Sequence, residues 1–327
     1  MRIETHTNKE VFQELVQELS HSLYHHHATN ILLSAETIHD SFEIGFTVRE
    51  NNKLSASVCI TNNTDLFYQN KRACCFSHYE CSDNLTTSQY LLQHAINYCK
   101  QKGYSYLLGP MNGSTWNSYR FALEPMTDNF FTEPYHQPYY VNQLEHIGFQ
   151  TAATYVTQQD SILKPFEMHV QFDSSITFRT LCMQQYEVEL KNIFQFCSTI
   201  FQNNFLYTTI EEQNFLNKYL ALKEVLQPEL ILLAEHQGEL VGLLLAIHDY
   251  HCKFEKRLIL KTIGRKRGKQ YAGVAHELGL RMLQTAQTQK YQHILHAFMH
   301  QSNTSKNLSR KFSGEPFRSY KLFYLAL

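Results

Sequence analysis

The 327-residue sequence has little of what marks several special classes of protein. Its 12 glycines and 7 prolines are too few for a collagen-like or linker-rich chain. No apolar run reaches the roughly 18 residues that a membrane-spanning helix needs. The N-terminal segment MRIETHTNKEVFQEL carries acidic side chains where a secretion signal has an apolar core. We therefore expect a cytoplasmic protein that is not exported.

Paired-cysteine motifs are also absent. The eight cysteines form no C-x-x-C pair and recur at no fixed interval. In a chain with 43% apolar and 18% charged residues, this usage is typical of reduced, mostly buried thiols in a globular protein. We therefore expect no metal site.

What the sequence does contain is one order of elements that occurs twice. Helices interleaved with strands predict an α/β architecture, with a mixed (α+β) central sheet flanked by helices in each half. The predicted helices are 10–28, 86–102, 138–147, 187–202, 211–226, 274–288 and 304–312. The predicted strands are 41–50, 54–61, 72–79, 104–108, 149–157, 177–181, 230–235, 240–249, 257–263, 291–299 and 317–326. Turn-forming residues interrupt the periodicity at 158–175, so we predict two domains, 1–160 and 161–327.

The net charge of −1 hides a difference between these halves. Residues 1–160 carry 9 basic and 16 acidic side chains, whereas residues 161–327 carry 20 and 14. The first half is therefore acidic and the second basic. This split suggests that the two predicted domains have different roles.

The sharpest local signal is segment 265–275, Arg-Lys-Arg-Gly-Lys-Gln-Tyr-Ala-Gly-Val-Ala, called the basic loop below. It lies between a predicted strand and a predicted helix, where backbone N–H groups and the positive end of the helix dipole favour an anion. Gly268 and Gly273 have no Cβ, so a ligand can approach the backbone closely. From Lys253 to Lys269 there are eight basic residues and one acid. The loop therefore predicts a site for a phosphate-bearing ligand.

Two common phosphate motifs, G-x-x-x-x-G-K-[ST] and G-x-G-x-x-G, do not occur in this loop. Gln270-x-x-Gly273-x-Ala275 instead resembles the [Q/R]-x-x-G-x-[G/A] loop of the GCN5-related N-acetyltransferases (GNATs), which holds the pyrophosphate of acetyl-CoA. The order of elements over residues 175–327 is similar to the order in that family. Segment 303–314 resembles the family's next motif, an Asn-led helix, and segment 138–149 resembles the same helix in the first half.

The resemblance implies two tandem GNAT-like domains. Residues 80–85 in the first half are acidic and contain no glycine, so we expect only the 161–327 domain to have an acyl-CoA site. The resemblance also implies an N-acetyltransferase that moves an acetyl group from acetyl-CoA to a primary amine of a small molecule or peptide. We expect a monomer or homodimer, and no nucleic-acid or membrane partner. The implied cofactor-binding residues are Thr262, Ile263, Arg265, Arg267, Gly268, Lys269, Gln270, Tyr271, Ala272, Gly273, Val274, Ala275, Asn303 and Lys306.

Catalytic residues are less well defined by the sequence. In the family, a tyrosine on the Asn-led helix often protonates the leaving thiolate, but Arg310 occupies that position here. Tyr320, on the last predicted strand, is a candidate substitute for this acid. His248 and His300, each near the end of a predicted strand, are candidate bases.

The first half has one polar, aromatic-rich loop, which contains the only tryptophan. We expect its Asn112, Trp116, Tyr119 and Arg120 to shape an acceptor pocket or the face between domains. Arg120 would suit an acceptor that carries a carboxylate.

Two other functions remain open. The missing tyrosine favours a non-catalytic tandem module, although the intact basic loop argues against it. Some tandem GNAT-like proteins instead transfer aminoacyl groups from tRNA in cell-wall synthesis, and these have no CoA loop. Binding of acetyl-CoA separates the proposed acetyltransferase from this last class.

Overall fold

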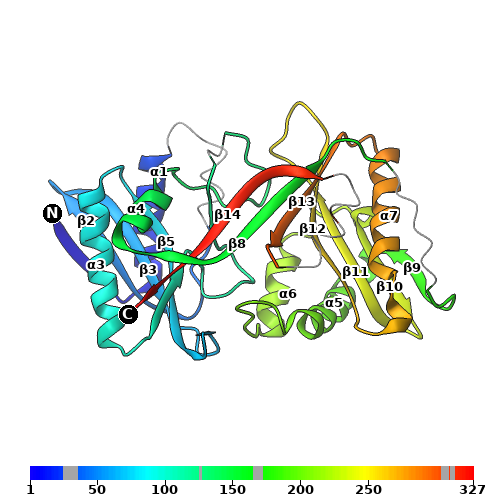
Figure 1. Ribbon diagram of the computed structural model, residues 1–327, viewed down its shortest axis with the longest axis horizontal. Helices are drawn as coiled ribbons and strands as arrows, with labels where there is room; N and C mark the ends of the chain where they lie inside the picture. The colour runs from blue at the N-terminus through cyan, green and yellow to red at the C-terminus, as the bar shows by residue number, and fades with distance from the viewer. Residues whose placement is uncertain (25–35, 125–126, 165–171, 303–308, 310–313) are drawn as a thin grey trace. The chain divides into compact units, whose positions relative to one another are not determined.

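The computed structural model describes residues 1–24, 36–124, 127–164, 172–302, 309 and 314–327. The chain divides into two compact units. Unit 1 comprises Met1–Thr154, Phe205–Thr208 and Ser319–Leu327, and unit 2 comprises Tyr155–Asn204 and Thr209–Arg318. Figure 1 gives the labels of the elements.

Unit 1 is built on a mixed sheet. Its helices are α1 (Lys9–Leu23), α3 (Leu85–Gln101) and α4 (Tyr140–Ile147). Its strands are β1 (Arg2–His6), β2 (Phe42–Glu50), β3 (Lys53–Thr61), β4 (Phe67–Tyr68), β5 (Lys71–Cys81), β6 (Tyr106–Gly109) and β7 (Phe121–Ala122). The order of the main strands is β1-β2-β3-β5-β6, in which only β5 and β6 are parallel.

Two strands have residues in both units: β8 (Gln150–Asp160) and β14 (Glu315–Ala326). The C-terminal part of β14 pairs antiparallel with β6. The sequence predicts this closing strand correctly but assigns it to the second half, whereas the residues from Ser319 onward pack in unit 1. Local periodicity predicts that a segment is a strand, but the partner of that strand depends on distant residues.

Unit 2 has the same kind of sheet. Its helices are α5 (Tyr186–Phe201), α6 (Glu212–Leu220) and α7 (Val274–Thr288), with short 3-10 turns η1 (Met183–Gln185), η2 (Pro228–Leu230) and η3 (Lys269–Tyr271). Its strands are β9 (Thr177–Thr180), β10 (Ile231–His236), β11 (Glu239–His248), β12 (Arg257–Arg265) and β13 (His293–His300). Their order is β8-β13-β12-β11-β10-β9, and only β12 and β13 are parallel.

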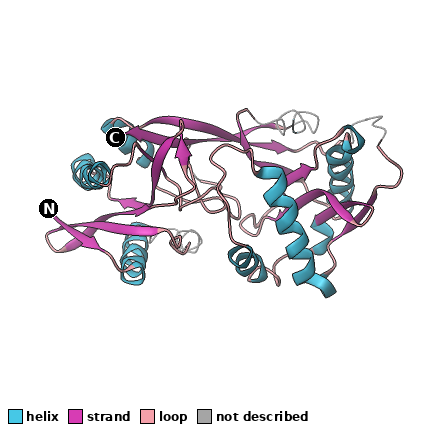
Figure 2. Ribbon diagram, turned by 90° about the horizontal axis from the view of Figure 1, so that it is seen from below, coloured by secondary structure: helices cyan, strands magenta, loops and turns pink. Residues whose placement is uncertain are grey.

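Two glycines show how helices cover both faces of the unit 2 sheet. A Cβ on Gly242 of β11 would lie 2.6 Å from the side chain of Val274 at the start of α7. A Cβ on Gly264 of β12 would lie 2.3 Å from the side chain of Ile200 in α5. Alternate residues of paired strands face opposite sides, so α5 and α7 lie on opposite faces, as Figure 2 shows. Apolar residues of α7 pack against those of β11 and β12 in one hydrophobic core on the α7 face of the sheet.

The mixed α/β fold predicted from the sequence is confirmed, and most of the predicted elements are present. Strand β1 was not predicted, because it is short and carries two charged side chains. Helix α6 ends at Leu220 rather than at 226. The predicted helix at 304–312 lies almost wholly outside the described residues. All eight cysteines are free and six are buried. Among the described helices, none is long and apolar enough to cross a membrane.

Candidate functional site

The basic loop joins β12 to α7 in unit 2, as the sequence predicts. Gly273 is the N-cap residue of α7, with φ 92° and ψ −21°. This positive φ favours glycine over any residue with a Cβ. Glycine has no side chain with which to accept hydrogen bonds from the first N–H groups of the helix, which have no acceptor within the helix itself. The N-terminus of α7 therefore offers donors and the positive end of a dipole to an anion.

The side chains of the basic loop fall into two groups. Arg265 donates from Nη1 to the carbonyl of Lys266 at 2.9 Å, and the Lys266 Nζ lies 2.6 Å from a carboxylate oxygen of Glu239. Arg267 and Lys269 are exposed, and no other described residue forms an ion pair with either. These two cations next to the α7 N-terminus suit a phosphate.

The parallel strands β12 and β13 part before they reach this end of the sheet. Their pairing ends at Leu260 and His296. Beyond these residues β12 continues to Arg265 and β13 to His300. We call the space between these two strand ends the β12–β13 opening. Because the strands are parallel, the opening lies at the same end as the basic loop.

A bulge lies at the start of this opening. On β11, Leu245 pairs with Thr262 and Ala246 pairs with Leu260, so Lys261 is an extra residue on β12. A β-bulge of this kind interrupts the ladder and redirects a side chain. Lys261 Nζ lies 4.7 Å from the centre of the Phe298 ring on β13. The Lys261 side chain thus spans from one edge of the opening to the other.

The structure separates the histidines named in the sequence analysis. His300 is partly exposed at the end of β13, with its Nδ1 2.8 Å from the Ser302 hydroxyl, so it lies at the same end as the basic loop. His248 pairs with Leu258 at the opposite end of β12, seven residues or roughly 20 Å from Arg265. The geometry therefore brings His300, but not His248, to the end of the sheet that carries the loop.

A third histidine, His296, is buried beside the last paired residue of β12. Burial lowers its pKa to about 4, so the ring is neutral at pH 7. Burial also lowers the pKa of His248, more than the nearby Asp249 carboxylate raises it.

Tyr320 lies in unit 1 and is almost completely buried. Its hydroxyl donates a hydrogen bond to the Glu133 carboxylate, which is also buried. This contact gives Tyr320 a structural role inside unit 1, and its role as an acid stays a prediction.

The predicted substrate residues of the first half also make contacts inside unit 1. Asn112 is buried, accepts from the backbone N–H of His39 and donates to the carbonyl of Thr37, both at 2.9 Å. Trp116 donates from Nε1 to the carbonyl of Thr208 at 3.0 Å. The Arg120 guanidinium lies 3.9 Å from the centre of the Tyr119 ring. These contacts hold the loop in place, and binding of a substrate there stays a prediction.

The remaining predicted site residues have mixed outcomes. Thr262 and Ile263 follow the bulge on β12 and are partly exposed. Asn303 and Lys306 lie outside the described residues. The sequence analysis did not single out the side chain of Lys261, although a lysine in the middle of a predicted strand is an unusual residue that could have drawn attention to it.

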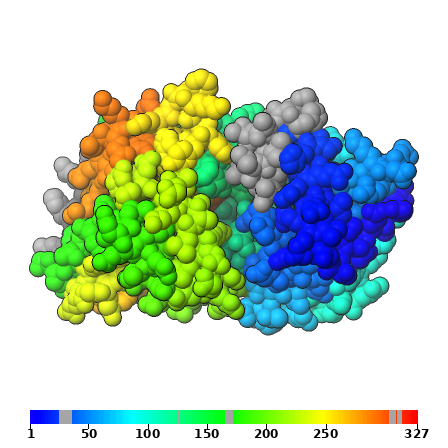
Figure 3. All heavy atoms as spheres, turned by 180° about the vertical axis from the view of Figure 1, so that it is seen from behind, coloured from blue at the N-terminus to red at the C-terminus, as the bar shows by residue number. Residues whose placement is uncertain are grey.

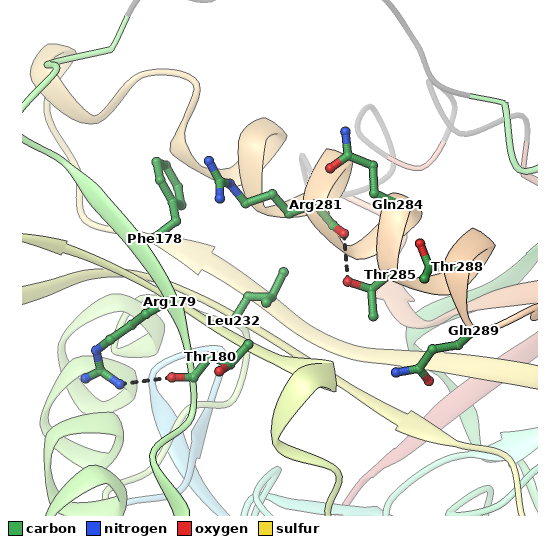
Figure 4. Close-up of a pocket in the computed structure, with 9 residues that line it drawn as sticks. All are labelled: Phe178, Arg179, Thr180, Leu232, Arg281, Gln284, Thr285, Thr288 and Gln289. Atoms are coloured by element: carbon green, nitrogen blue, oxygen red, sulfur yellow. Dashed lines mark hydrogen bonds between the residues drawn. The ribbon is translucent and has the colours of Figure 1, made fainter.

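Unit 2 also has a pocket of about 370 Å³ at the C-terminal half of α7 (Figure 4). Arg281 of α7 lies over the ring of Phe178 at 4.6 Å, and Leu232 of β10 also lines the pocket. The other residues that line the pocket are Arg179, Thr180, Gln284, Thr285, Thr288 and Gln289. The pocket contains none of the residues predicted to bind a cofactor, and it lies at the other end of α7 from the basic loop. Among the described residues, no group of three metal-ligating side chains occurs.

Comparisons with known proteins identify the fold. No protein-family model and no curated protein matches the sequence. Solved structures do match: a GCN5-related N-acetyltransferase from Sphaerobacter thermophilus has 11% identity and a TM-score of 0.56, covering 99% of this chain and 95% of its own. A tandem GNAT protein from the clavulanic acid biosynthesis pathway has 8% identity and a TM-score of 0.57, covering 99% and 98%.

A third structure, a GCN5-related N-acetyltransferase from Anabaena variabilis, has 9% identity and a TM-score of 0.59, covering 99% of this chain and 72% of its own. The chain therefore has the GNAT fold that the basic loop predicts. At these identities the likeness is one of fold alone.

Proposed function

We propose that the protein is an acetyl-CoA-dependent N-acetyltransferase, with its acyl-CoA site in unit 2 at the basic loop and the β12–β13 opening. One observation carries the proposal: Gly273 leaves the N-terminus of α7 without a side-chain cap, next to two exposed cations. The donors are N–H groups and the charges are positive, so the residues present fit the diphosphate of CoA. The fold shared with N-acetyltransferases supports the same assignment.

Each part of the site has a distinct task in this proposal. The N–H groups of the first turn of α7, with Arg267 and Lys269, bind the diphosphate. The backbone of β12 at 261–263, which follows the bulge, orients the acyl carbonyl. Acetyl-CoA supplies an activated thioester. The amine nitrogen bonds to the acyl carbon as the carbon–sulfur bond breaks, the amine loses a proton, and the thiolate gains one.

His300 is the candidate to accept the proton from the amine. It lies at the same end of the sheet as the basic loop and is partly exposed. A neutral imidazole nitrogen can accept a proton, as a general base requires. The acyl acceptor is a primary amine of a small molecule or peptide.

Isothermal calorimetry with acetyl-CoA tests the proposal. Gly273→Glu places a carboxylate in front of the α7 N–H groups, and we expect binding to fall below detection. Gly148→Glu is the matched control, because Gly148 also has a positive φ, of 101°, with no atom within 4 Å of an added Cβ, but lies in unit 1. The control should bind like the wild type.

Two outcomes would contradict the proposal. Wild-type protein that binds no CoA ester would remove the acyl-CoA site. Protein that binds acetyl-CoA but releases no CoA thiol with any primary amine, in an assay with a thiol reagent, would be a non-catalytic module. A folded Gly273→Glu variant, checked by circular dichroism, is needed for the comparison.

A further inference from the structure

A second group of polar side chains lies at the other end of the unit 2 sheet from the basic loop. His293 is the first residue of β13, and Ser161 directly follows β8. Glu255 lies in the connection between β11 and β12. His293 pairs with Arg257 at the start of β12, whereas the basic loop begins at the far end of that strand, roughly 25 Å away. The group is therefore separate from the proposed acyl-CoA site.

The three side chains form one hydrogen-bonded chain. The His293 Nδ1 lies 2.9 Å from the Ser161 hydroxyl oxygen, and its Nε2 lies 2.7 Å from a carboxylate oxygen of Glu255. The amide nitrogen of Gln159 lies 3.1 Å from the same hydroxyl oxygen and 3.3 Å from Nδ1. An amide nitrogen can only donate, so Nδ1 is an acceptor and the ring proton is on Nε2, facing the carboxylate. The hydroxyl of Ser161 therefore donates to Nδ1, which is the direction that removal of its proton requires.

The turn that follows β8 fixes the position of Ser161. The buried Asp160 carboxylate accepts from the backbone N–H groups of Ile162 and Leu163 at 2.9 and 3.1 Å. Ser161 lies inside this turn and is exposed, and the His293 side chain is 20% exposed. A small substrate can therefore reach the hydroxyl and the base from solvent.

A purely structural role explains this arrangement less well. Exposed ion pairs contribute little to the stability of a fold. A hydroxyl within reach of an imidazole, whose other nitrogen is held by a carboxylate, is the arrangement that activates serine nucleophiles on unrelated folds. Ser41 in unit 1 offers a comparison, because its hydroxyl lies 2.7 Å from Nδ1 of His39. Among the described residues, no carboxylate forms an ion pair with the His39 ring.

We propose that unit 2 has a hydrolytic site for carboxylic esters, in which Ser161 is the nucleophile, His293 is the base and Glu255 positions the base. The Ser161 oxygen bonds to the acyl carbon, its proton passes to Nδ1 of His293, and the alcohol leaves with that proton. Water then attacks the acyl-serine, loses a proton to Nδ1, and releases the carboxylic acid as Ser161 regains its proton. The amide N–H groups of Gln159, which already face the Ser161 oxygen, can donate to the oxyanion. This activity goes beyond the proposed function and does not depend on it.

The experiment uses the full chain without any CoA ester. A fluorophosphonate forms a bond from phosphorus to an activated serine oxygen and loses fluoride, and we expect peptide mass spectrometry to place this adduct on Ser161. We also expect the protein to hydrolyse p-nitrophenyl acetate, and Ser161→Ala to reduce the rate to that of buffer. Ser41→Ala is the matched control, which should be labelled and should hydrolyse the ester like the wild type.

Two further variants test the base and the residue that positions it. His293→Gln should lower kcat/KM for the ester by about 100-fold, the value of one general base, and should remove the increase in rate with pH. Glu255→Gln should lower kcat by at least about tenfold and leave KM unchanged, because it alters the orientation of the base and not the binding of the ester. A purely structural role for Glu255 would leave kcat unchanged in the folded variant.

The results also separate this inference from the proposed function. No adduct on Ser161 in the wild type, or ester hydrolysis by Ser161→Ala at the wild-type rate, would overturn the hydrolytic site whatever the outcome with acetyl-CoA. Labelling needs no variant, so this test does not depend on how the variants fold. Calorimetry with acetyl-CoA should give the same affinity for Ser161→Ala and the wild type, because the basic loop is intact.

Discussion

Units 1 and 2 each have a helix that follows one strand of a parallel pair, and the two helices begin differently. α3 follows β5, which is parallel to β6, and Asn84 caps it by accepting from the N–H groups of Thr86 and Thr87 at 2.9 and 3.3 Å. α7 follows β12, which is parallel to β13, and begins at Gly273 without a side-chain cap. In the same backbone arrangement, the first N–H groups of α3 thus have a side-chain acceptor, whereas those of α7 can donate to a ligand.

The segments that lead into the two helices also differ in charge. Residues 80–85 contain two acids and no base, whereas residues 265–275 contain four bases and no acid. In unit 1, the Glu80 carboxyl is buried and accepts from the hydroxyls of Tyr24 and Tyr140. We infer that only one of the two helix N-termini serves as an anion site.

Figure 3 shows the face of the molecule opposite to that in Figure 1, where the surface of unit 2 includes α5 and α6, coloured green to lime.

Charge reversal of the basic loop should have the largest effect on this comparison. Arg267→Glu with Lys269→Glu should weaken acetyl-CoA binding at least about 100-fold, since it replaces two charged contacts with repulsion. The matched control is Lys53→Glu with Lys100→Glu, two exposed lysines of unit 1, which should leave the affinity within twofold. Calorimetry at fixed ionic strength measures both, and equal losses in the two double variants would show that the effect is one of net charge only.

Unit 1 should lose stability as the pH rises. Burial raises the pKa of Glu80 to about 7, from its ordinary value near 4.5, despite the hydrogen bonds from Tyr24 and Tyr140. A raised carboxyl pKa contributes stability that is fully present below pH 4.5 and is lost as the pH rises through 7, worth about 3 kcal/mol. Glu80→Gln should remove this pH dependence. Urea unfolding followed by the fluorescence of Trp116, the only tryptophan and a residue of unit 1, measures it.

Two results would contradict that account: a wild-type unfolding free energy that does not change between pH 4.5 and 8, or a Glu80→Gln variant whose unfolding free energy depends on pH as strongly as that of the wild type. Tyr24→Phe is a useful control because it removes one hydrogen bond to the carboxyl without removing the carboxyl itself.

Unit 2 should show the opposite pH dependence. Burial lowers the pKa of His296 to about 4 from 6.5, so its contribution to stability is present above pH 6.5 and is lost as the pH falls through 4. The full change is about 3 kcal/mol. His296→Asn should make the unfolding free energy of unit 2 less dependent on pH in this range. Hydrogen exchange of the β12 and β13 amides follows unit 2 separately from unit 1, and an unchanged slope in the variant would contradict the assignment.

The smallest effect is expected at the cap of α3. Asn84→Ala removes the acceptor of two N–H groups and should cost about 1 kcal/mol in the stability of unit 1, with no change in acetyl-CoA affinity. Thermal unfolding followed by Trp116 fluorescence measures the cost. A gain of acetyl-CoA binding at α3 in this variant would mean that the cap alone had prevented it, and that the acidic residues before α3 have no part.

The elements of the site that lie in one stretch of sequence were predictable. The basic loop, Gly273 and the start of α7 are contiguous, and the preference of anions for a helix N-terminus needs no tertiary information. The Asn84 cap could also have been read from the sequence, since Asn before a helical pattern is a common start signal.

The parts that depend on pairing between distant segments were not predictable. The periodicity of β14 shows that Tyr320 lies on a strand, but not that its hydroxyl donates to Glu133 in unit 1. The bulge that gives Lys261 its position depends on the register between β11 and β12, which the turn between these strands and their packing decide. His248 and His300 are each the last residue of a strand, and only the topology places them at opposite ends of the sheet.

The number of acetyl-CoA molecules bound per chain tests the central claim most directly. Calorimetry on the full chain should give one molecule per chain, and Arg267→Glu with Lys269→Glu should abolish it. Two molecules per chain, or one molecule that is unaffected by this double variant, would contradict the assignment of the acyl-CoA site to the N-terminus of α7.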